Sequence, residues 1–530
     1  MLFTSYEFLV FLTVVFLLYY LAPKKLQWVI LLAASLVFYM LAGPGYLIFI
    51  LLTIASSYVA SRAMGRLSDE ESIYLEQFRG TMTKEERKAY KALYKKKRFR
   101  ILVAALVFNF GILAILKYTG FTVNNINSLL HTFGSDKTLV IPSLLLPLGI
   151  SFYTFQTMGY LIDVYREKAV PEKNPARLAL FVSFFPQLIQ GPISRYGDLA
   201  EQLYSPHKFD TRNFTYGAWR ILWGYFKKLV IADRVLIAIN TMLDSPEEYG
   251  GAYVVLLVFL YSIEIYGDFT GGIDITIGIA EALGIKVTEN FNHPFFSKST
   301  KEYWRRWHIT MGTWFTDYIF YPVSVCKPMM KLTKKCREKL GNNIGKRIPV
   351  YLATILTWFL TGLWHGAGWN FIVWGLLNCL VILVSQELEP LYKKFHGRFP
   401  RLTSSRGYSF FMMFRTFWLM GFIRSLDCYR DVPLTFRMWG SIFTEGNWAQ
   451  MLGGGIGTLG LGVADFVILA CGCLLLLAVS AYGVKHDVRE KLCRGNFLSF
   501  AAFALCFVTV IMLGAYGVGY DATQFIYNQF

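Results

Sequence analysis

Apolar stretches long enough to cross a lipid bilayer recur along the whole chain and constrain its fold more than any other feature. A membrane-spanning helix needs roughly 20 predominantly apolar residues. Hydrophobic residues make up 55% of the 530 residues and charged residues only 17%, whereas a soluble chain of this size has many charged helix faces. We therefore predict an all-α polytopic membrane protein with about 12 transmembrane helices. The predicted spans are 3–22, 27–42, 45–60, 101–121, 139–163, 218–243, 251–283, 349–365, 367–386, 408–424, 462–484 and 497–516.

Two further segments do not fit simple spans. Residues 178–200 combine apolar side chains with Pro186, Gly191 and Pro192, and residues 290–325 mix Asn, Pro, aromatic and charged residues. Broken backbone at membrane depth is tolerated only where protein or a water-filled cavity surrounds it. We predict re-entrant or in-plane helices in both segments, on the cytoplasmic side and around a central tunnel. Because the sequence contains no internal repeat, we predict a single membrane domain over residues 1–530.

The net charge of +18 is concentrated in four basic segments between the apolar runs. These segments lie near 61–100, 327–347, 393–406 and 485–494. The positive-inside rule places all four in the cytoplasm, which puts the N-terminus outside a plasma or inner membrane. The first apolar run lacks a basic n-region and a small-residue cleavage site, so we interpret it as a retained span. Membrane topology and contact with anionic lipids explain most of this charge. The alternative is that part of it docks an anionic acyl donor. We predict no surface for nucleic acid.

The eight cysteines all follow residue 325, and their spacing matches no zinc motif with accompanying histidines. We expect neither a structural disulfide nor a metal site. A catalytic cysteine that forms a thioester would need an adjacent base, and the sequence offers none.

Ionisable residues inside apolar runs are the candidate functional residues. His365 lies in TGLWHGAGWNFIVWG (from Thr361), and His308 lies in the basic-aromatic patch YWRRWHIT. An ionisable side chain in lipid is costly, so it normally faces a cavity or pathway; the alternative for His365 is a packed polar residue hydrogen-bonded between helices. Asp268 and Asp274 must likewise be paired or solvated, and pairing with Arg305 or Arg306 is one option.

Longer strings carry a family resemblance. The string EIYGDFTGGIDITIGIAEALGIKVTENFNHPFFSKSTKEYWRRWHITMGTWFTDYIFYP (from Glu264), followed by the His365 block, is similar to the core of the membrane-bound O-acyltransferases. Upstream, LPLGISFYTFQTMGYLIDVYR and FFPQLIQGPISRY resemble its bacterial branch, which acylates cell-envelope polymers. The resemblance covers about residues 1–425 and leaves 426–530 as a C-terminal extension with two further spans. Gly272 and Ile273 depart from it, since the family pattern has Tyr and Ser there.

The resemblance implies transfer of an acyl group from a thioester to a hydroxyl. It assigns His365 as the catalytic base, for which a neutral imidazole is suited, and His308 as a second catalytic or donor-positioning residue. Gly366–Gly368 either admit the acyl thioester or allow close helix packing. The remaining substrate-binding candidates are Trp364, Arg305, Arg306, Asn292, Asp268 and Gln156.

The same resemblance sets the expected donor and partners. We expect acetyl-CoA or an acyl carrier thioester as a cytoplasmic donor substrate, with no bound cofactor. We also expect an extracytoplasmic serine hydrolase-like acyltransferase as partner, because the chain has no GxSxG nucleophile motif of its own. Two alternatives stay open: D-alanyl transfer from a carrier protein to teichoic acid, and a non-enzymatic transporter. Paired inverted repeats would support the transporter, and the sequence has none.

Overall fold

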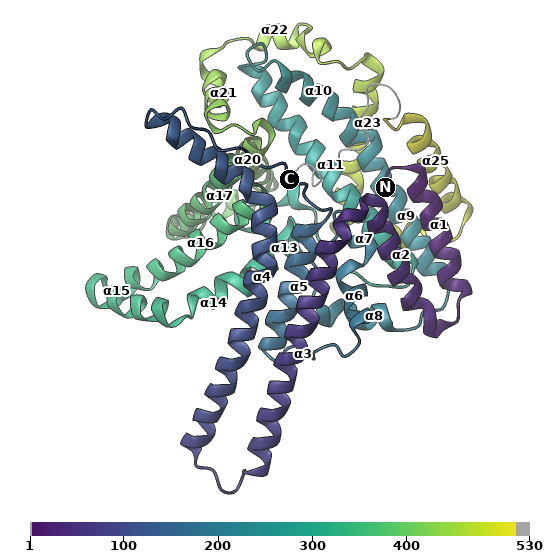
Figure 1. The fold of residues 1–530 in the computed structure, drawn as a ribbon. Helices are drawn as coiled ribbons and strands as arrows, with labels where there is room; N and C mark the ends of the chain where they lie inside the picture. Colours follow the sequence, from purple (N-terminus) through teal and green to yellow (C-terminus); the bar gives the residue numbers. More distant parts are fainter. Residues whose placement is uncertain (1–2, 516–530) are drawn as a thin grey trace. The chain divides into compact units, whose positions relative to one another are not determined.

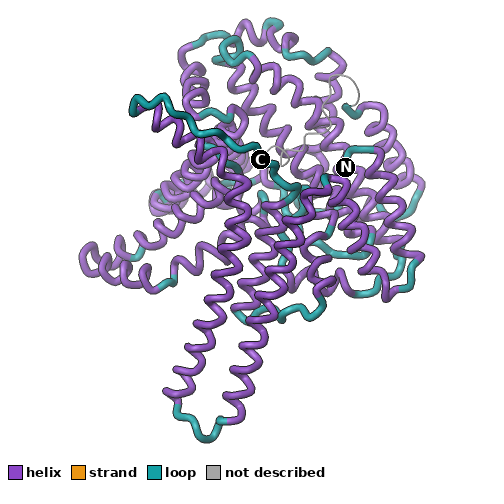
Figure 2. The backbone as a smooth tube through the Cα atoms, in the orientation of Figure 1, coloured by secondary structure: helices purple, strands orange, loops and turns teal. Residues whose placement is uncertain are grey.

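The chain is almost entirely helical in the computed structural model, which describes residues 3–515. Figure 2 shows helices joined by loops, and no strand occurs within the described range. The chain divides into two compact units, Met1–Phe214 with Ala280–Val287, and Thr215–Ile279 with Thr288–Phe530. Whether these units form the single domain expected from the sequence stays a prediction.

The first unit is built around a long antiparallel hairpin. In Figure 1 the hairpin consists of α3 and α4, which lie side by side and join through a short loop. Thr83 and Glu86 form a capping box that starts α4, which satisfies backbone N–H groups that the first helical turn leaves free. The helices of this unit are α1 (Tyr6–Leu21), α2 (Gln27–Ala42), α3 (Leu47–Gln77), α4 (Lys84–Thr132), α5 (Ile150–Tyr165), α6 (Pro175–Ser183), α7 (Phe185–Leu188) and α8 (Tyr196–Tyr204).

The second unit contains most of the chemistry-bearing residues. Two of its helical stretches include π-helical turns, at Phe226–Ala232 and Thr316–Phe320, and such turns often occur at functional sites. Its longer helices are α9 (Thr211–Tyr225), α10 (Asp233–Asp244), α11 (Ala252–Ala282), α15 (Lys327–Gly345), α16 (Arg347–His365), α17 (Trp369–Glu387), α18 (Glu389–Arg398), α20 (Arg406–Tyr429), α21 (Val432–Thr444), α23 (Val463–Gly483) and α25 (Phe497–Leu513). Shorter helices are α12 (Thr300–Arg306), α13 (Ile309–Phe315), α14 (Tyr321–Ser324), α19 (Pro400–Thr403), α22 (Trp448–Leu452) and α24 (Val488–Leu492).

Seven helices within residues 3–515 are long and apolar enough to cross a membrane. They include α2, α3, α4, α11, α16, α17 and α23, and the shorter α1 and α25 are also apolar. These helices confirm the prediction of an all-α, multi-pass membrane protein. The number of about 12 spans stays a prediction.

The predicted span at 139–163 is wrong in its first half. The helix begins only at Ile150, and the preceding residues are irregular. Pro142 and Pro147 explain the difference, because proline lacks an N–H donor and pushes the residue before it out of the helical region. Apolar composition alone therefore overestimated the length of this helix.

The two segments predicted to be broken are indeed interrupted. Residues 178–200 contain the end of α6, the single turn α7 and the start of α8, while 290–325 contain a 3₁₀ turn and α12 to α14. Their expected position in the membrane stays a prediction. The basic segment at 327–347 is helical over most of its length. It forms α15, which begins with Pro328 in the first helical turn and is interrupted at Gly341.

Candidate active site

His308 occupies a buried turn between α12 and α13. Its side chain is 0% exposed, and its backbone is left-handed with φ 49° and ψ 53°. Trp307 before it is extended and ends α12, whereas the carbonyl of His308 accepts the N–H of Gly312 and starts α13. Left-handed backbone is uncommon outside glycine and often marks a constrained functional position.

Asn290 fixes this turn and the proton position on the imidazole. Its side-chain oxygen accepts hydrogen bonds from the N–H and hydroxyl of Thr310, at 3.0 and 2.9 Å. That oxygen lies 3.2 Å from Nδ1 of His308. Because a backbone N–H can only donate, the group facing it must be the amide oxygen, and Nδ1 of His308 therefore donates to it. The neutral ring then has its basic nitrogen at Nε2.

Burial keeps His308 neutral. The pKa of His308 falls to about 3, chiefly because burial removes the water that would solvate an imidazolium ion, and secondly because the charge of Arg424 opposes it. Arg424, from α20, lies over the Trp307 ring at 4.1 Å and donates to the Tyr303 hydroxyl at 3.0 Å. The imidazole is thus a neutral hydrogen-bond acceptor at any physiological pH.

His365 is the last residue of α16, immediately before the tight Gly366–Gly368 turn into α17. Its ring lies 4.6 Å from Trp374 and 5.0 Å from Trp364, both in edge-on contacts. A Cβ at Gly366 would meet the Phe371 ring at 2.1 Å. Of the two alternatives for this glycine, close packing of α16 against α17 is therefore the one that the structure supports.

Trp364 brings the two histidines into one site. The Trp364 indole is 4% exposed, and its ring centroid lies 5.7 Å from His308 and 5.0 Å from His365. The histidines lie 57 residues apart in sequence on separate segments, yet they contact the same side chain. The resemblance placed both in one site, and this arrangement is compatible with that assignment.

Tryptophans of three helices extend this site. Trp304 from α12 contacts Trp358 of α16 at 5.0 Å and Trp374 of α17 at 5.6 Å. Its indole N–H donates to the Asn378 side chain at 3.2 Å. Because aromatic rings bury large areas and hold fixed relative orientations, this cluster fixes α12 against the hairpin that includes His365.

Other predicted site residues lie elsewhere or make different contacts. Arg305 is exposed and Asn292 is exposed, whereas Arg306 forms an ion pair with Glu302 at 2.7 Å. Gln156 belongs to the first unit, where it donates to the Phe181 carbonyl at 2.8 Å and accepts the Ser194 N–H. The contacts of Gln156 brace the broken α6–α7 segment.

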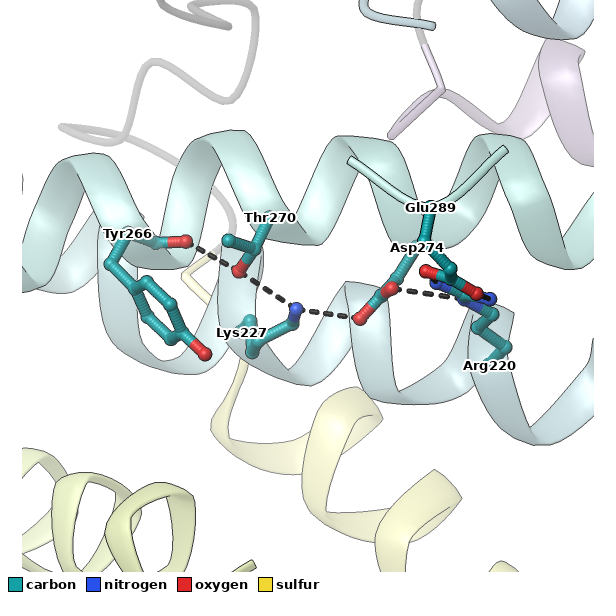
Figure 3. Close-up of polar contacts among 6 residues, drawn as sticks. All are labelled: Arg220, Lys227, Tyr266, Thr270, Asp274 and Glu289. Carbon is teal, nitrogen blue, oxygen red and sulfur yellow. Dashed lines mark hydrogen bonds and ion pairs between the residues drawn. The ribbon is translucent and has the colours of Figure 1, made fainter. Parts of the chain in front are cut away.

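The suggested pairing of two aspartates with Arg305 or Arg306 is wrong. Asp268, which is 0% exposed, binds Lys228 at 2.6 Å. Asp274 instead binds Arg220 at 3.0 Å and Lys227 at 2.6 Å, as Figure 3 shows. All three basic residues come from the segment that we predicted as the span 218–243. The structure therefore uses the charges of this segment to neutralise those of α11, as buried charges require.

Sequence reasoning missed Asn290 and Arg424. Asn290 carries no signal by itself, because buried asparagine is common. Arg424 ends the predicted apolar span 408–424 and so carried the same signal as His365, but it was overlooked. Asn290 precedes the string FNHPFF and lies 18 residues before His308, so only the folded turn links the two. The eight cysteines are free thiols within residues 3–515.

Comparison with known proteins decides the family. The chain is 31% identical over 498 residues to the probable alginate O-acetylase AlgI of Azotobacter vinelandii, covering 93% of this chain and 87% of that protein. A family model described as MBOAT, membrane-bound O-acyltransferase family, matches residues 173–335. The chain belongs to this family. The part of this O-acyltransferase that the family model matches includes Asn290 and His308 and ends before His365.

The names of two further relatives give different acyl groups, acetyl in one and D-alanyl in the other. The peptidoglycan O-acetyltransferase of Helicobacter pylori is 32% identical over 340 residues, covering 59% of each chain. The teichoic acid D-alanyltransferase of Bacillus subtilis is 30% identical over 259 residues, covering 47% of this chain and 61% of that protein. The names support a membrane acyltransferase that acts on envelope polymers.

Proposed function

We propose that this O-acyltransferase moves an acetyl group from a cytoplasmic thioester to hydroxyl groups destined for a cell-envelope polysaccharide. The observation that carries the proposal is that His308 and His365, from separate segments, contact the same Trp364 indole. The long match to an alginate O-acetylase supports acetyl over other acyl groups.

In the proposed reaction His365 is the general base. It removes the proton from the acceptor hydroxyl as that oxygen attacks the thioester carbonyl. The tetrahedral intermediate then collapses with cleavage of the carbon–sulfur bond, and the imidazolium returns the proton to the leaving thiolate. The products are an ester and a free thiol, so the step needs no oxidant, metal or further proton.

His308 positions the donor in this proposal. Its Nδ1 is committed to Asn290, so the lone pair of the neutral ring is on Nε2. We expect this nitrogen to accept a hydrogen bond from an amide N–H of the donor near the thioester. Trp364, which contacts both imidazoles, limits the space for water, which would otherwise hydrolyse the thioester.

The donor is acetyl-CoA or an acyl carrier thioester approaching from the cytoplasm. Arg305 at the exposed surface of α12 is suited to the donor phosphates, since guanidinium groups bind phosphates well. A tunnel through the membrane unit would let the outer acceptor reach the same histidines. Delivery to the polymer then requires an extracytoplasmic serine hydrolase-like partner. In this proposal the chain itself lies in a plasma or inner membrane, with its N-terminus outside.

The role of His365 is tested by replacement. Membranes containing His365→Ala are expected to transfer radiolabelled acetyl groups roughly 10²- to 10⁴-fold more slowly than the wild type, the range typical for loss of a general base. His396→Ala, at an exposed position on α18, is the matched control. Wild-type acetylation by a His365→Ala protein that reaches the membrane in normal amounts would end the proposal.

The D-alanyl alternative is favoured by one observation, the match to teichoic acid D-alanyltransferases. Those matches cover under half of this chain, whereas the alginate O-acetylase match covers 93%. Supplying cells with labelled acetate and labelled D-alanine in parallel separates the two. If only D-alanine is incorporated, and this incorporation is lost in His365→Ala, then His365 has the proposed role but the transferred group is D-alanyl.

A further inference from the structure

A second candidate site lies in the same unit and is not used by the proposed reaction. It is a cavity of about 670 Å³, within the size range of small-molecule sites. Its walls come from α9 with the following π-helical turn, the C-terminal half of α11, residues 289–293, and helices α23, α24 and α25. His308, Trp364 and His365 are absent from its lining. We call it the lateral cavity.

One wall of the lateral cavity is apolar. It includes Leu475 and Val479 from α23 and Leu505 from α25, together with Trp219 and Trp223 of α9. Leu475 and Leu505 are also 47% and 69% exposed, so the wall continues onto the outer surface of two apolar helices. In a membrane protein this outer surface is in contact with lipid chains, which gives an acyl chain a continuous apolar path into the cavity.

The other wall carries the ion-pair network of Figure 3. Both terminal nitrogens of Arg220 donate hydrogen bonds to Glu289, at 2.6 and 2.5 Å, and its Nε donates one to Asp274 at 3.0 Å. Lys227 donates to Asp274 at 2.6 Å and to Thr270 at 2.8 Å. A guanidinium has five N–H donors and an ammonium three. Within residues 3–515, these hydrogen bonds leave two donors of Arg220 and one of Lys227 for a ligand.

The charges around the lateral cavity balance. Besides Arg220 and Lys227 its lining contains Arg489, and these three cations are matched by Asp274, Glu289 and Asp487. A site for an anion would have an excess of cations. An equal number of separated charges instead complements a ligand that carries both signs.

The membrane boundary that the sequence predicts lies near the charged side of the lateral cavity. The lining includes Gly483, at the end of the apolar helix α23, and continues into His486 and Arg489. These residues belong to or adjoin the basic segment 485–494, which the positive-inside rule assigns to the cytoplasmic face. With this predicted boundary, the apolar wall of the lateral cavity lies within the bilayer and its charged groups lie at the depth of the lipid head groups.

We propose that the lateral cavity binds one phospholipid with a zwitterionic head group of the phosphatidylethanolamine type. The phosphate accepts the remaining donors of Arg220 and Lys227 together with Arg489. The ammonium group pairs with Glu289, whose side chain is 54% exposed. The acyl chains follow Val479, Leu475 and Leu505 to the outer surface.

The proposal is tested by filling the apolar wall. Wild-type protein is equilibrated with equal amounts of phosphatidylethanolamine and phosphatidylglycerol, and bound lipid is counted by native mass spectrometry. We expect one retained phosphatidylethanolamine, and about a tenfold or greater loss in Val479→Trp, because the indole occupies the space that the acyl chains need. Ala478→Trp, on the exposed neighbouring position outside the lining, is the matched control and should retain the lipid.

A second substitution tests the head group. Glu289→Gln leaves the lining with one more cation than carboxylates, so the preference should shift toward phosphatidylglycerol. If Val479→Trp does not yield folded protein, Ala502→Trp from α25 fills the same wall. Equal lipid retention by the filled and control variants would overturn the proposal. Wild-type preference for phosphatidylglycerol, or displacement of the lipid by coenzyme A, would contradict it equally.

Discussion

The imidazole of His308 donates its Nδ1 proton to the side-chain oxygen of Asn290, 3.2 Å away, in the buried turn between α12 and α13. This oxygen also accepts from the N–H and hydroxyl of Thr310. One side chain therefore orients the ring, selects its tautomer and closes the turn. The hydrogen bond at one ring nitrogen decides which nitrogen of a neutral imidazole keeps its lone pair.

Replacing Asn290 should affect both stability and activity. Asn290→Ala leaves the Thr310 N–H and the His308 ring without their acceptor in a buried site, which costs about 1–3 kcal/mol of unfolding free energy. Acetyl transfer should fall further than this loss of stability explains, because the ring is free to change tautomer. Asn290→Asp retains the oxygen but places an ionisable carboxyl group in a fully buried site, so it should recover little of the stability. Thermal unfolding and acetyl transfer, measured on the same preparations, check both parts.

Stability should depend on pH through His308. Its pKa is about 3 in the folded protein and about 6.5 when unfolded. Between these values the unfolded chain holds a proton that the folded chain lacks. His308 therefore contributes stability at pH 7 that is lost as the pH falls below about 6.5, at about 1.4 kcal/mol per pH unit.

The variant His308→Asn tests this pH dependence. Asparagine tolerates the left-handed backbone and does not titrate. The pH slope of its unfolding free energy between about pH 4 and pH 5.5 should be smaller than that of the wild type by about one proton. His396→Asn, at an exposed site, is the control. Identical slopes for wild type and His308→Asn would contradict a neutral, buried His308.

Gly366→Ala should disturb the turn that holds His365. The new methyl group would lie 2.1 Å from the Phe371 ring, so α16 and α17 must separate or the ring must move. Such overpacking typically costs about 1–3 kcal/mol, and we expect acetyl transfer to fall because the His365 ring shifts with its helix. Adding Phe371→Leu should recover stability and part of the activity. Failure of this second change to help would show that the ring is not the obstacle.

The two carboxylates bound to Arg220 should contribute unequally to stability. Asp274 is shared by Arg220 and Lys227 and its side chain is 18% exposed, whereas that of Glu289 is 54% exposed. Removing one partner from a buried pair typically costs about 3–5 kcal/mol, so Asp274→Asn should strongly destabilise the protein. Glu289→Gln should cost about 1 kcal/mol or less, as for exposed pairs. Comparing the thermal unfolding of the two variants measures the difference, and equal losses would contradict it.

The apolar helices were predictable from the sequence because their signal is local. The predicted spans 27–42 and 462–484 agree with α2 and α23 within about one residue at each end. The span 139–163 failed where Pro142 and Pro147 interrupt an apolar run, since hydrophobicity carries no information about backbone donors. His308 and His365 were identifiable as candidates for a similar reason, because ionisable residues in apolar surroundings stand out without knowledge of their neighbours.

The partners of these residues were decided only by the tertiary structure. Asp274 pairs with Arg220 and Lys227 and not with Arg305 or Arg306, because helical packing, not proximity in sequence, determines which buried charges meet. Asn290 selects the His308 tautomer across 18 residues, and Trp364 joins His308 to His365 through edge-on ring contacts. The sequence by itself determined which segments are apolar helices and which side chains are costly to bury. The folded chain determined which partner stabilises each buried polar or charged side chain. Hydrogen bonds and ion pairs depend on ångström-scale distances that a linear pattern does not contain.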